Sequence, residues 1–197
     1  MSKAVEFFFD VGSPTTYLAW TQLPALCAKA GATLVYRPTL LGGVFQATGN
    51  ASPANVAAKG RYMNDDMARF AARYGVPLVV NPHFPINTLT LMRGAAGVQL
   101  RMPARFDDYL RGVFKAMWVD GLNMNDPAVA GRALHAAGFD PAEIIALTND
   151  AEVKAALRAT TEEAVARGVF GAPTFFVDGR LYFGQDRLAF VREALAS

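Results

Sequence analysis

The sequence predicts an α/β domain that is interrupted by an all-helical insertion, and three observations support this class. Short apolar runs with the character of strands occur at residues 5–9, 33–38 and 174–183. Between about residues 53 and 168 the apolar side chains recur with helical spacing almost throughout. The chain has 197 residues, of which 52% are hydrophobic, so it can bury a sizeable core. The order β-α-β, a helical block, then α-β-β-α is typical of a small sheet whose chain leaves the domain and returns.

The N-terminal part predicts a strand, a helix and a second strand. Residues 5–9 are a continuous aromatic and apolar run, which is typical of a buried strand. Helical spacing follows from residue 14 to about 29, and Gly31 supplies a stop signal. Pro24 lies inside this helix, so we expect a kink just before it. The run at 33–38 forms the second strand, parallel to the first and joined to it by a right-handed crossover.

The middle of the chain predicts a block of helices separated by short breaks. We expect six of them, at residues 61–74, 87–100, 103–119, 127–137, 141–147 and 152–167. The predicted division of the chain is therefore an α/β domain at residues 1–52 and 158–197, with the helical insertion at 53–157.

The C-terminal part returns to the period of strands. Residues 174–177 and 180–183 are short apolar runs joined by the turn signal Asp178-Gly179, so they predict a β-hairpin. A helix at 186–196 closes the fold.

Ser13 stands where the first strand ends and the first helix begins. The chain turns at Gly12, and Pro14 follows Ser13 in the first turn of the helix. Serine is a favoured N-cap and proline is favoured at the first helical position, so the Ser13 hydroxyl should lie beside unpaired backbone N–H groups that suit an anion. In thioredoxin-like redox proteins the same corner carries Cys-x-x-Cys, whereas here it reads Ser13-Pro14-Thr15-Thr16. If the fold is that one, the site can only stabilise a thiolate that arrives on a ligand.

Pro173 stands at the entrance of the strand at 174–177, where a proline gives up a hydrogen-bond donor of the sheet. Two explanations are open: the proline simply begins the strand, or the Ala172-Pro173 peptide is cis. A cis peptide would turn the backbone of Ala172 outward and leave its N–H and C=O free to pair with an extended peptide ligand. We expect the cis form, close to Ser13 in space.

Two weaker signals concern charge and polarity. Gln185 and Asp186 follow the hairpin, where they could hold an α-amino group, although the motif taken alone is better explained by Asp186 as the N-cap of the last helix. Asn50 lies in a Gly-Asn turn and Lys59 follows it, an arrangement that is ordinary for a surface turn and a surface lysine.

Histidine and cysteine give little chemistry. His83 lies in a proline-rich loop, and His135 lies on a helix, where a structural role is expected. Two histidines so far apart, without carboxylates at ligand spacing, argue against a metal site. The single cysteine, Cys27, lies on an apolar helix face as a core thiol and excludes an intrachain disulfide. A reducing, cytoplasmic setting is the simplest interpretation.

Charge and hydropathy limit the partners. The 19 Lys and Arg residues against 17 Asp and Glu give a formal net charge of +2, and the basic residues are scattered, which argues against a nucleic-acid or membrane-surface partner. No stretch approaches the roughly 20 apolar residues that span a bilayer, and we expect no signal peptide.

Several segments together resemble the 2-hydroxychromene-2-carboxylate isomerases, which group with kappa-class glutathione transferases in the disulfide-bond-oxidoreductase branch of thioredoxin-like folds. They run in the family's order and spacing from residue 5 to about 190. The segments are Phe8-Phe9-Asp10-x-x-Ser13-Pro14-x-x-Tyr17-Leu18-Ala19, Gly49-Asn50, Lys59-x-x-Tyr62, Val169-Phe170-Gly171-Ala172-Pro173-Thr174-Phe175 and Gly184-Gln185-Asp186-Arg187. The resemblance implies a thioredoxin-like domain with a helical insertion, a homodimer, and reduced glutathione as the cofactor.

The resemblance also implies a role for each matching residue. Ser13 hydrogen-bonds the glutathione sulfur. The backbone clamp with its cis-proline is formed by Ala172 and Pro173, and the γ-glutamyl end of glutathione is held by Gln185 and Asp186. The glycine carboxylate is bound near Asn50 and Lys59, and the organic substrate is contacted by Asn55 and Phe84.

The implied reaction interconverts 2-hydroxychromene-2-carboxylate and trans-o-hydroxybenzylidenepyruvate, an aromatic 2-oxo acid of naphthalene-type degradation. Reversible conjugate addition of a thiolate would let the double bond rotate and would return glutathione unchanged. Two alternatives are open: a kappa-class transferase that consumes glutathione on other electrophiles, and a redox-silent thioredoxin-like module that binds peptides without turnover. Product analysis separates the isomerase from the transferase, and peptide binding without turnover would identify the binding module.

Overall fold

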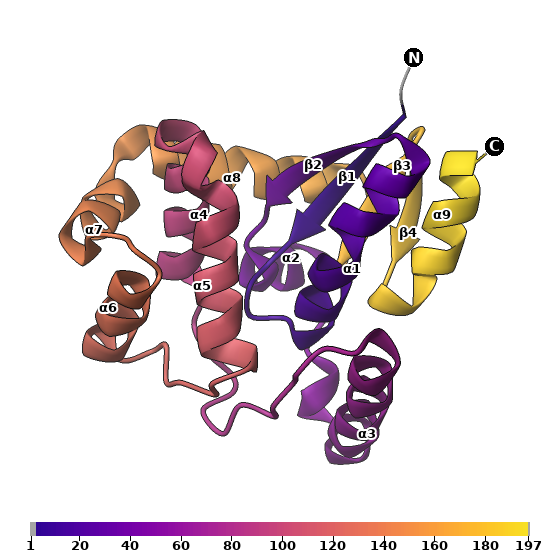
Figure 1. Cartoon of the computed structure of the whole chain (residues 1–197), viewed down its shortest axis with the longest axis horizontal. Coiled ribbons are helices and arrows are strands. Elements are labelled where there is room, and N and C mark those ends of the chain that lie inside the picture. The colour runs from indigo at the N-terminus through magenta and orange to yellow at the C-terminus, as the bar shows by residue number, and fades with distance from the viewer. Residues whose placement is uncertain (1–2, 197) are drawn as a thin grey trace.

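A four-stranded mixed sheet forms the centre of the computed structural model, which describes residues 3–196 (Figure 1). The strands lie in the order β2-β1-β3-β4 and comprise β1 (Ala4–Phe9), β2 (Thr33–Pro38), β3 (Thr174–Val177) and β4 (Arg180–Phe183). Strand β2 is parallel to β1, whereas β3 is antiparallel to β1 and β4 is antiparallel to β3. The predicted strands, the parallel first pair and the terminal hairpin are confirmed.

Helices cover both faces of this sheet and build the insertion. They are α1 (Pro14–Ala30), α2 (Leu41–Thr48), α3 (Ala57–Tyr74), α4 (Leu89–Arg101), α5 (Phe106–Trp118), α6 (Pro127–Ala136), α7 (Pro141–Asn149), α8 (Ala151–Ala166) and α9 (Leu188–Ala196), with 3-10 turns η1 (Pro53–Asn55), η2 (Pro103–Arg105) and η3 (Gln185–Arg187). The six predicted helices of the middle block are all present, with ends shifted by a few residues. Helix α1 continues through Pro24 as one element.

Helix α2 was not predicted from the sequence. Its first turn holds Gly42 and Gly43, which lower helix propensity, and Leu40 at the N-cap offers no side-chain acceptor. The acceptor comes instead from Asp10, whose Oδ2 lies 2.8 Å from the Leu41 nitrogen although the two residues are 31 apart in sequence. Local patterns therefore could not reveal the start of this helix.

The aromatic residues of β1 divide between two cores because successive strand residues point to opposite faces. Phe7 and Phe9 stack at 5.2 Å between ring centroids, and Phe7 stacks on Phe175 at 5.5 Å, in the large core shared with α1, α4, α5 and α9. Phe8 and Phe176 face the opposite way and pack in a smaller core beneath α2 and α8. Figure 1 shows α1 and α9 in front of the sheet and α8 behind it.

Arg167, the C-cap of α8, fastens that helix to the sheet. Its guanidinium group binds Glu6 at 2.6 Å and Glu163 at 3.0 Å, and lies 3.9 Å from the ring centroid of Phe176. The hydrogen bond from Arg167 holds the pKa of the Glu6 carboxyl below its usual value. Helix α8 is continuous across residues 157 and 158 and contacts both α4 and β2. The predicted boundary between the helical insertion and the α/β domain at residue 158 therefore stays a proposal.

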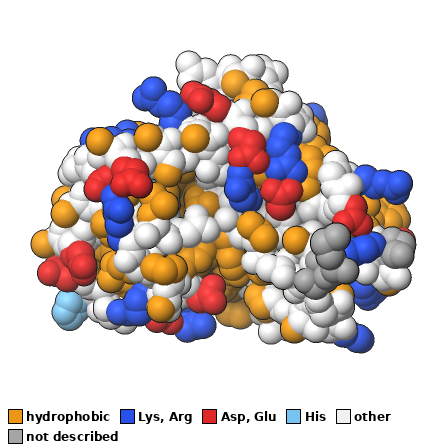
Figure 2. Space-filling view, turned by 90° about the horizontal axis from the view of Figure 1, so that it is seen from above, with side chains coloured by type: hydrophobic (Ala, Val, Ile, Leu, Met, Phe, Trp, Pro, Cys, Tyr) orange, Lys and Arg blue, Asp and Glu red, His pale blue; other side chains and the backbone are white. Residues whose placement is uncertain are grey.

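Basic and acidic side chains lie beside one another on the face shown in Figure 2, at the end of the molecule where β1 begins. The structure contains ion pairs between such side chains, for example Arg101 with Glu152 at 2.5 Å. Within residues 3–196, no helix is long and apolar enough to cross a membrane.

Candidate active site

Ser13 occupies the corner between β1 and α1, as predicted. It is the N-cap of α1, and its Oγ accepts a hydrogen bond from the Thr16 N–H at 3.2 Å. Pro14 takes the first helical position. Ser13 is buried, with 6% of its surface exposed, and the aligned peptide dipoles of α1 give this corner a partial positive charge. The position therefore favours an anion next to the Ser13 hydroxyl.

The Ser13 hydroxyl contacts the segment before β3. Its Oγ lies 3.0 Å from the Ala172 carbonyl oxygen and 2.9 Å from Thr15 Oγ1. The Ala172-Pro173 peptide is cis, so the predicted isomer and its place beside Ser13 are both confirmed. The expectation that the Ala172 C=O is free was wrong, because the Ser13 hydroxyl donates to it. The Ala172 N–H has no acceptor among residues 3–196.

Thr16 takes the second cysteine position of the dithiol proteins. It is fully buried, and its Oγ1 has no hydrogen-bond partner within the described part of the chain. The corner thus keeps polar oxygen atoms at both positions where redox relatives carry sulfur.

Asp10 is a buried polar residue beneath this corner to which no role was assigned from the sequence. Its Oδ1 accepts the Gly12 N–H at 2.8 Å, and its Oδ2 accepts the Leu41 N–H at 2.8 Å and the Thr88 hydroxyl at 3.0 Å. Desolvation by burial raises the pKa of the Asp10 carboxyl. The three donors join the turn before Ser13 to the starts of α2 and α4.

Gln185 and Asp186 lie next to the cis-proline segment, because the Gly184 N–H donates to the Pro173 carbonyl at 3.0 Å. Gln185 is buried, and its Oε1 accepts a 2.7 Å hydrogen bond from the Tyr74 hydroxyl. Burial of the Tyr74 ring raises the pKa of its hydroxyl.

Asp186 does not cap the last helix. It lies inside η3, whose N-cap is Gly184, and its carboxylate pairs with Arg187 at 2.5 Å. The simpler alternative for Asp186, a helix cap, was therefore wrong, and its carboxylate remains exposed beside Gln185.

Asn50 reaches the same segment from the end of α2. Its Nδ2 donates to the Phe170 carbonyl at 2.7 Å, two residues before Ala172. Lys59 lies exposed in the first turn of α3, and Asn55 lies exposed in η1 just before it. No ion pair holds Lys59 to any residue from 3 to 196, so its charge is available to a ligand.

Phe84 connects to the Ser13 turn through Trp118. The two rings lie 6.1 Å apart between centroids, and Trp118 Nε1 donates to the Val11 carbonyl at 2.8 Å, two residues before Ser13. The Phe84-Pro85 peptide is also cis, which the sequence analysis did not predict. Phe84 remains 38% exposed. His83 is exposed, and its backbone N–H donates to Asn81.

Cys27 lies far along α1 from this corner. It is 3% exposed, and burial raises the pKa of its thiol to about 11. The described residues contain no group of three or more His, Cys, Asp or Glu side chains placed to hold a metal ion.

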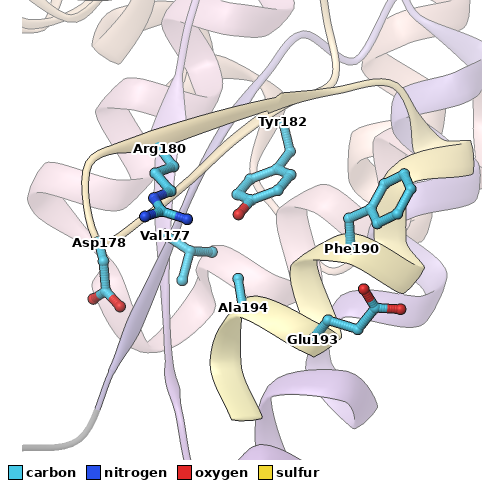
Figure 3. Close-up of a pocket in the computed structure, with 7 residues that line it drawn as sticks. All are labelled: Val177, Asp178, Arg180, Tyr182, Phe190, Glu193 and Ala194. Carbon is cyan, nitrogen blue, oxygen red and sulfur yellow. The ribbon is translucent and has the colours of Figure 1, made fainter. Parts of the chain in front are cut away.

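A surface cavity of about 580 Å³ lies elsewhere, between β4 and α9 (Figure 3). Arg180, Tyr182 and Glu193 are among its lining side chains. None of the predicted site residues lines it.

Comparisons with known proteins identify the family of the chain. Residues 4–196 match the family described as "DSBA-like thioredoxin domain". The chain is 30% identical over 197 residues to the 2-hydroxychromene-2-carboxylate isomerase of Sphingobium xenophagum, and the alignment covers 99% of each. It is also 30% identical to glutathione S-transferase kappa 2 of Caenorhabditis elegans, over 98% of this chain and 92% of that protein.

A solved structure of a 2-hydroxychromene-2-carboxylate isomerase matches with a TM-score of 0.86 and 28% identity, over 98% of this chain and 94% of that one. The expected thioredoxin-like fold with a helical insertion is therefore confirmed. The chain belongs to the DsbA-like thioredoxin family and, within it, to the group of the 2-hydroxychromene-2-carboxylate isomerases and kappa-class glutathione transferases.

Proposed function

We propose that this protein is a glutathione-dependent isomerase that interconverts 2-hydroxychromene-2-carboxylate and trans-o-hydroxybenzylidenepyruvate. The observation that carries the proposal is the place of the Ser13 hydroxyl, at the N-terminus of α1 and 3.0 Å from the Ala172 carbonyl. Ser13 and Thr16 stand at both cysteine positions of the dithiol proteins, so disulfide exchange lacks its sulfur atoms. A thiol that acts here must belong to a ligand.

The residues present fit reduced glutathione. The Ala172 N–H, which has no acceptor among residues 3–196, suits the backbone of an extended tripeptide. Tyr74 occupies Oε1 of Gln185, which leaves the amide nitrogen to donate to the γ-glutamyl carboxylate. The Asp186 carboxylate suits the ammonium group, and Lys59 with Asn50 suits the glycine carboxylate.

Ser13 stabilises the negative charge of the bound thiolate and is not itself a covalent nucleophile. Glutathione supplies, when bound, a thiolate for reversible conjugate addition to the substrate's double bond. A free thiol with a pKa of about 8.5 is mostly protonated at neutral pH, and both a hydroxyl donor and a helix N-terminus favour the thiolate. Asp10 holds the turn that presents Ser13. We assign Asn55 and the half-exposed Phe84 ring to the aromatic 2-oxo acid.

A kappa-class transferase is the second candidate, because relatives of that class reach the same 30% identity as the isomerase. The two activities differ in what happens to the thiol. An isomerase leaves the concentration of glutathione unchanged over many turnovers, whereas a conjugating enzyme consumes one molecule in each turnover.

The test is turnover of 2-hydroxychromene-2-carboxylate with and without reduced glutathione, followed by absorbance and by product analysis. We expect interconversion that requires glutathione and leaves its concentration constant. Full activity without glutathione would contradict the cofactor, and stoichiometric loss of thiol would favour the transferase. We also propose a homodimer in the cytoplasm, which light scattering and cell fractionation can test.

A further inference from the structure

Three oxygen atoms and one backbone N–H meet at the site corner, and their hydrogens can be counted. Ser13 Oγ lies 3.2 Å from the Thr16 nitrogen, 2.9 Å from Thr15 Oγ1 and 3.0 Å from the Ala172 carbonyl oxygen. Thr15 Oγ1 lies 3.4 Å from the same carbonyl. A serine hydroxyl carries one hydrogen and two lone pairs, and a carbonyl oxygen can only accept.

The distances decide how these hydrogens are shared. The Thr16 N–H fills one lone pair of Ser13 Oγ. The Ala172 carbonyl takes the single Ser13 hydrogen, because its distance of 3.0 Å to Ser13 is shorter than the 3.4 Å to Thr15. The 2.9 Å contact between the two hydroxyls then needs the Thr15 hydrogen, which fills the second lone pair of Ser13. Ser13 Oγ therefore has no lone pair left for a ligand, and it can serve a ligand only by redirecting its own hydrogen.

We infer that Thr15 is a positioning residue for Ser13: by donating to Ser13 Oγ, it makes the Ser13 hydroxyl a donor alone toward any ligand atom. This inference rests on the proposed use of glutathione. A thiol S–H needs an acceptor, and Ser13 has no lone pair left to give. A thiolate needs a donor, which Ser13 supplies when its hydrogen turns away from the Ala172 carbonyl. Thr15 thus biases the site toward the ionised sulfur.

Hydrogen bonds in a chain also polarise one another, so a hydroxyl that accepts from Thr15 is a stronger donor than an isolated one. Thr15 is partly exposed and lies on the first turn of α1, so a change of its side chain should leave the core intact. The shape of valine matches that of threonine, and valine lacks only the hydroxyl hydrogen bond.

The experiment compares the wild type with Thr15→Val, Thr15→Ser and Thr21→Val. Thr21 is the matched control, because it lies on the same helix and its hydroxyl donates at 2.7 Å to a backbone carbonyl, that of Leu18. The ultraviolet absorbance of the bound thiolate is titrated against pH for each protein. Binding of glutathione and of S-methylglutathione, which cannot ionise at sulfur, is measured by calorimetry.

We expect Thr15→Val to raise the pKa of the bound thiol by about 0.5 to 1 unit, which is about 0.7 to 1.4 kcal/mol at 1.36 kcal/mol per unit. Thr15→Ser should restore the wild-type titration, and Thr21→Val should not change it. Affinity for S-methylglutathione should be equal in all four proteins, because the binding of the tripeptide does not use the Thr15 hydroxyl.

Two failures can be told apart. A wild-type protein that lowers the pKa of the bound thiol, with Thr15→Val lowering it equally, overturns the inference and leaves the isomerase proposal standing. A wild-type protein that binds no glutathione overturns both. Loss of S-methylglutathione binding in Thr15→Val would show that the residue holds the tripeptide itself, which also overturns the inference.

Discussion

The Tyr74 hydroxyl donates a 2.7 Å hydrogen bond to Oε1 of Gln185 and so joins the end of α3 to the loop before α9. The two residues are 111 positions apart, and Gln185 is buried. The contact fixes which end of the amide faces a ligand, because the oxygen is held by the tyrosine. The insertion helix α3 therefore sets the orientation of a side chain that the α/β domain carries.

Tyr74→Phe should weaken glutathione binding by about two- to twelvefold, since a neutral hydrogen bond contributes about 0.5 to 1.5 kcal/mol and 1.4 kcal/mol is tenfold in affinity. Without the Tyr74 hydroxyl, the Gln185 amide group can flip and exchange the positions of its oxygen and nitrogen. Calorimetry with reduced glutathione measures the effect. Tyr62→Phe is the control, because Tyr62 lies on the same helix and is 62% exposed. Equal dissociation constants for the wild type and Tyr74→Phe would contradict this role.

Ser13→Ala should reduce turnover far more than it reduces the affinity for glutathione. The Ala172 N–H and the charged side chains assigned to the tripeptide make no hydrogen bond to the Ser13 hydroxyl, so binding should change by less than about threefold. The pKa of the bound thiol should rise by about one to two units, or about 1.4 to 2.7 kcal/mol. Steady-state kinetics measures the loss of turnover, and titration of the bound thiolate measures the change in its pKa. An unchanged thiol pKa in the variant would remove Ser13 from the chemistry.

Lys59→Ala and Asp186→Ala should each weaken glutathione binding by about ten- to a hundredfold, since a hydrogen bond to a charged group contributes about 1.5 to 3 kcal/mol. The tripeptide carries carboxylates at both ends and one ammonium group, so the two losses should be separable with truncated ligands. Lys154→Ala on α8 serves as a charge control. The placement is wrong if both variants bind glutathione as the wild type does.

Asp10→Ala should lower the free energy of unfolding by about 2 to 6 kcal/mol, because the Gly12 and Leu41 N–H groups lose their acceptor at about 1 to 3 kcal/mol each. Asp10→Asn keeps one acceptor oxygen and should lose less. Urea denaturation gives the numbers, and the circular dichroism of the folded protein shows whether α2 persists. Equal urea midpoints for the wild type and Asp10→Ala would refute this account of the turn.

Much of this architecture could be predicted from the sequence because the signals are local. The Ser13-Pro14 pair predicts a capped helix, Asp178-Gly179 predicts a tight hairpin turn, and both are present. The hairpin turn has positive φ at both residues, 49° and 75°, as its type requires. The position of Pro173 at the entrance of a strand is also a local signal, and it allowed the cis peptide to be predicted.

The missing features depend on residues that are distant in sequence. Helix α2 is capped by Asp10, and Gln185 is oriented by Tyr74, so neither could be inferred from its own neighbours. The cis peptide at Phe84-Pro85 lies in an irregular loop without periodicity. The alternative in which Asp186 caps the last helix was wrong, because Asp186 lies inside the 3-10 turn η3, which precedes α9 and has Gly184 as its N-cap.

Cys27 is the one cysteine of the chain, and its burial inside α1 with a pKa of about 11 makes it a poor target for oxidants. A mild oxidant such as diamide would convert glutathione to its disulfide and leave the polypeptide unaltered. Under the proposed dependence on glutathione, catalysis should then stop for lack of reduced cofactor and resume when fresh reduced glutathione is added. The rate of the enzyme would thus follow the redox state of the surrounding glutathione pool, although the protein itself carries no oxidisable switch at its site.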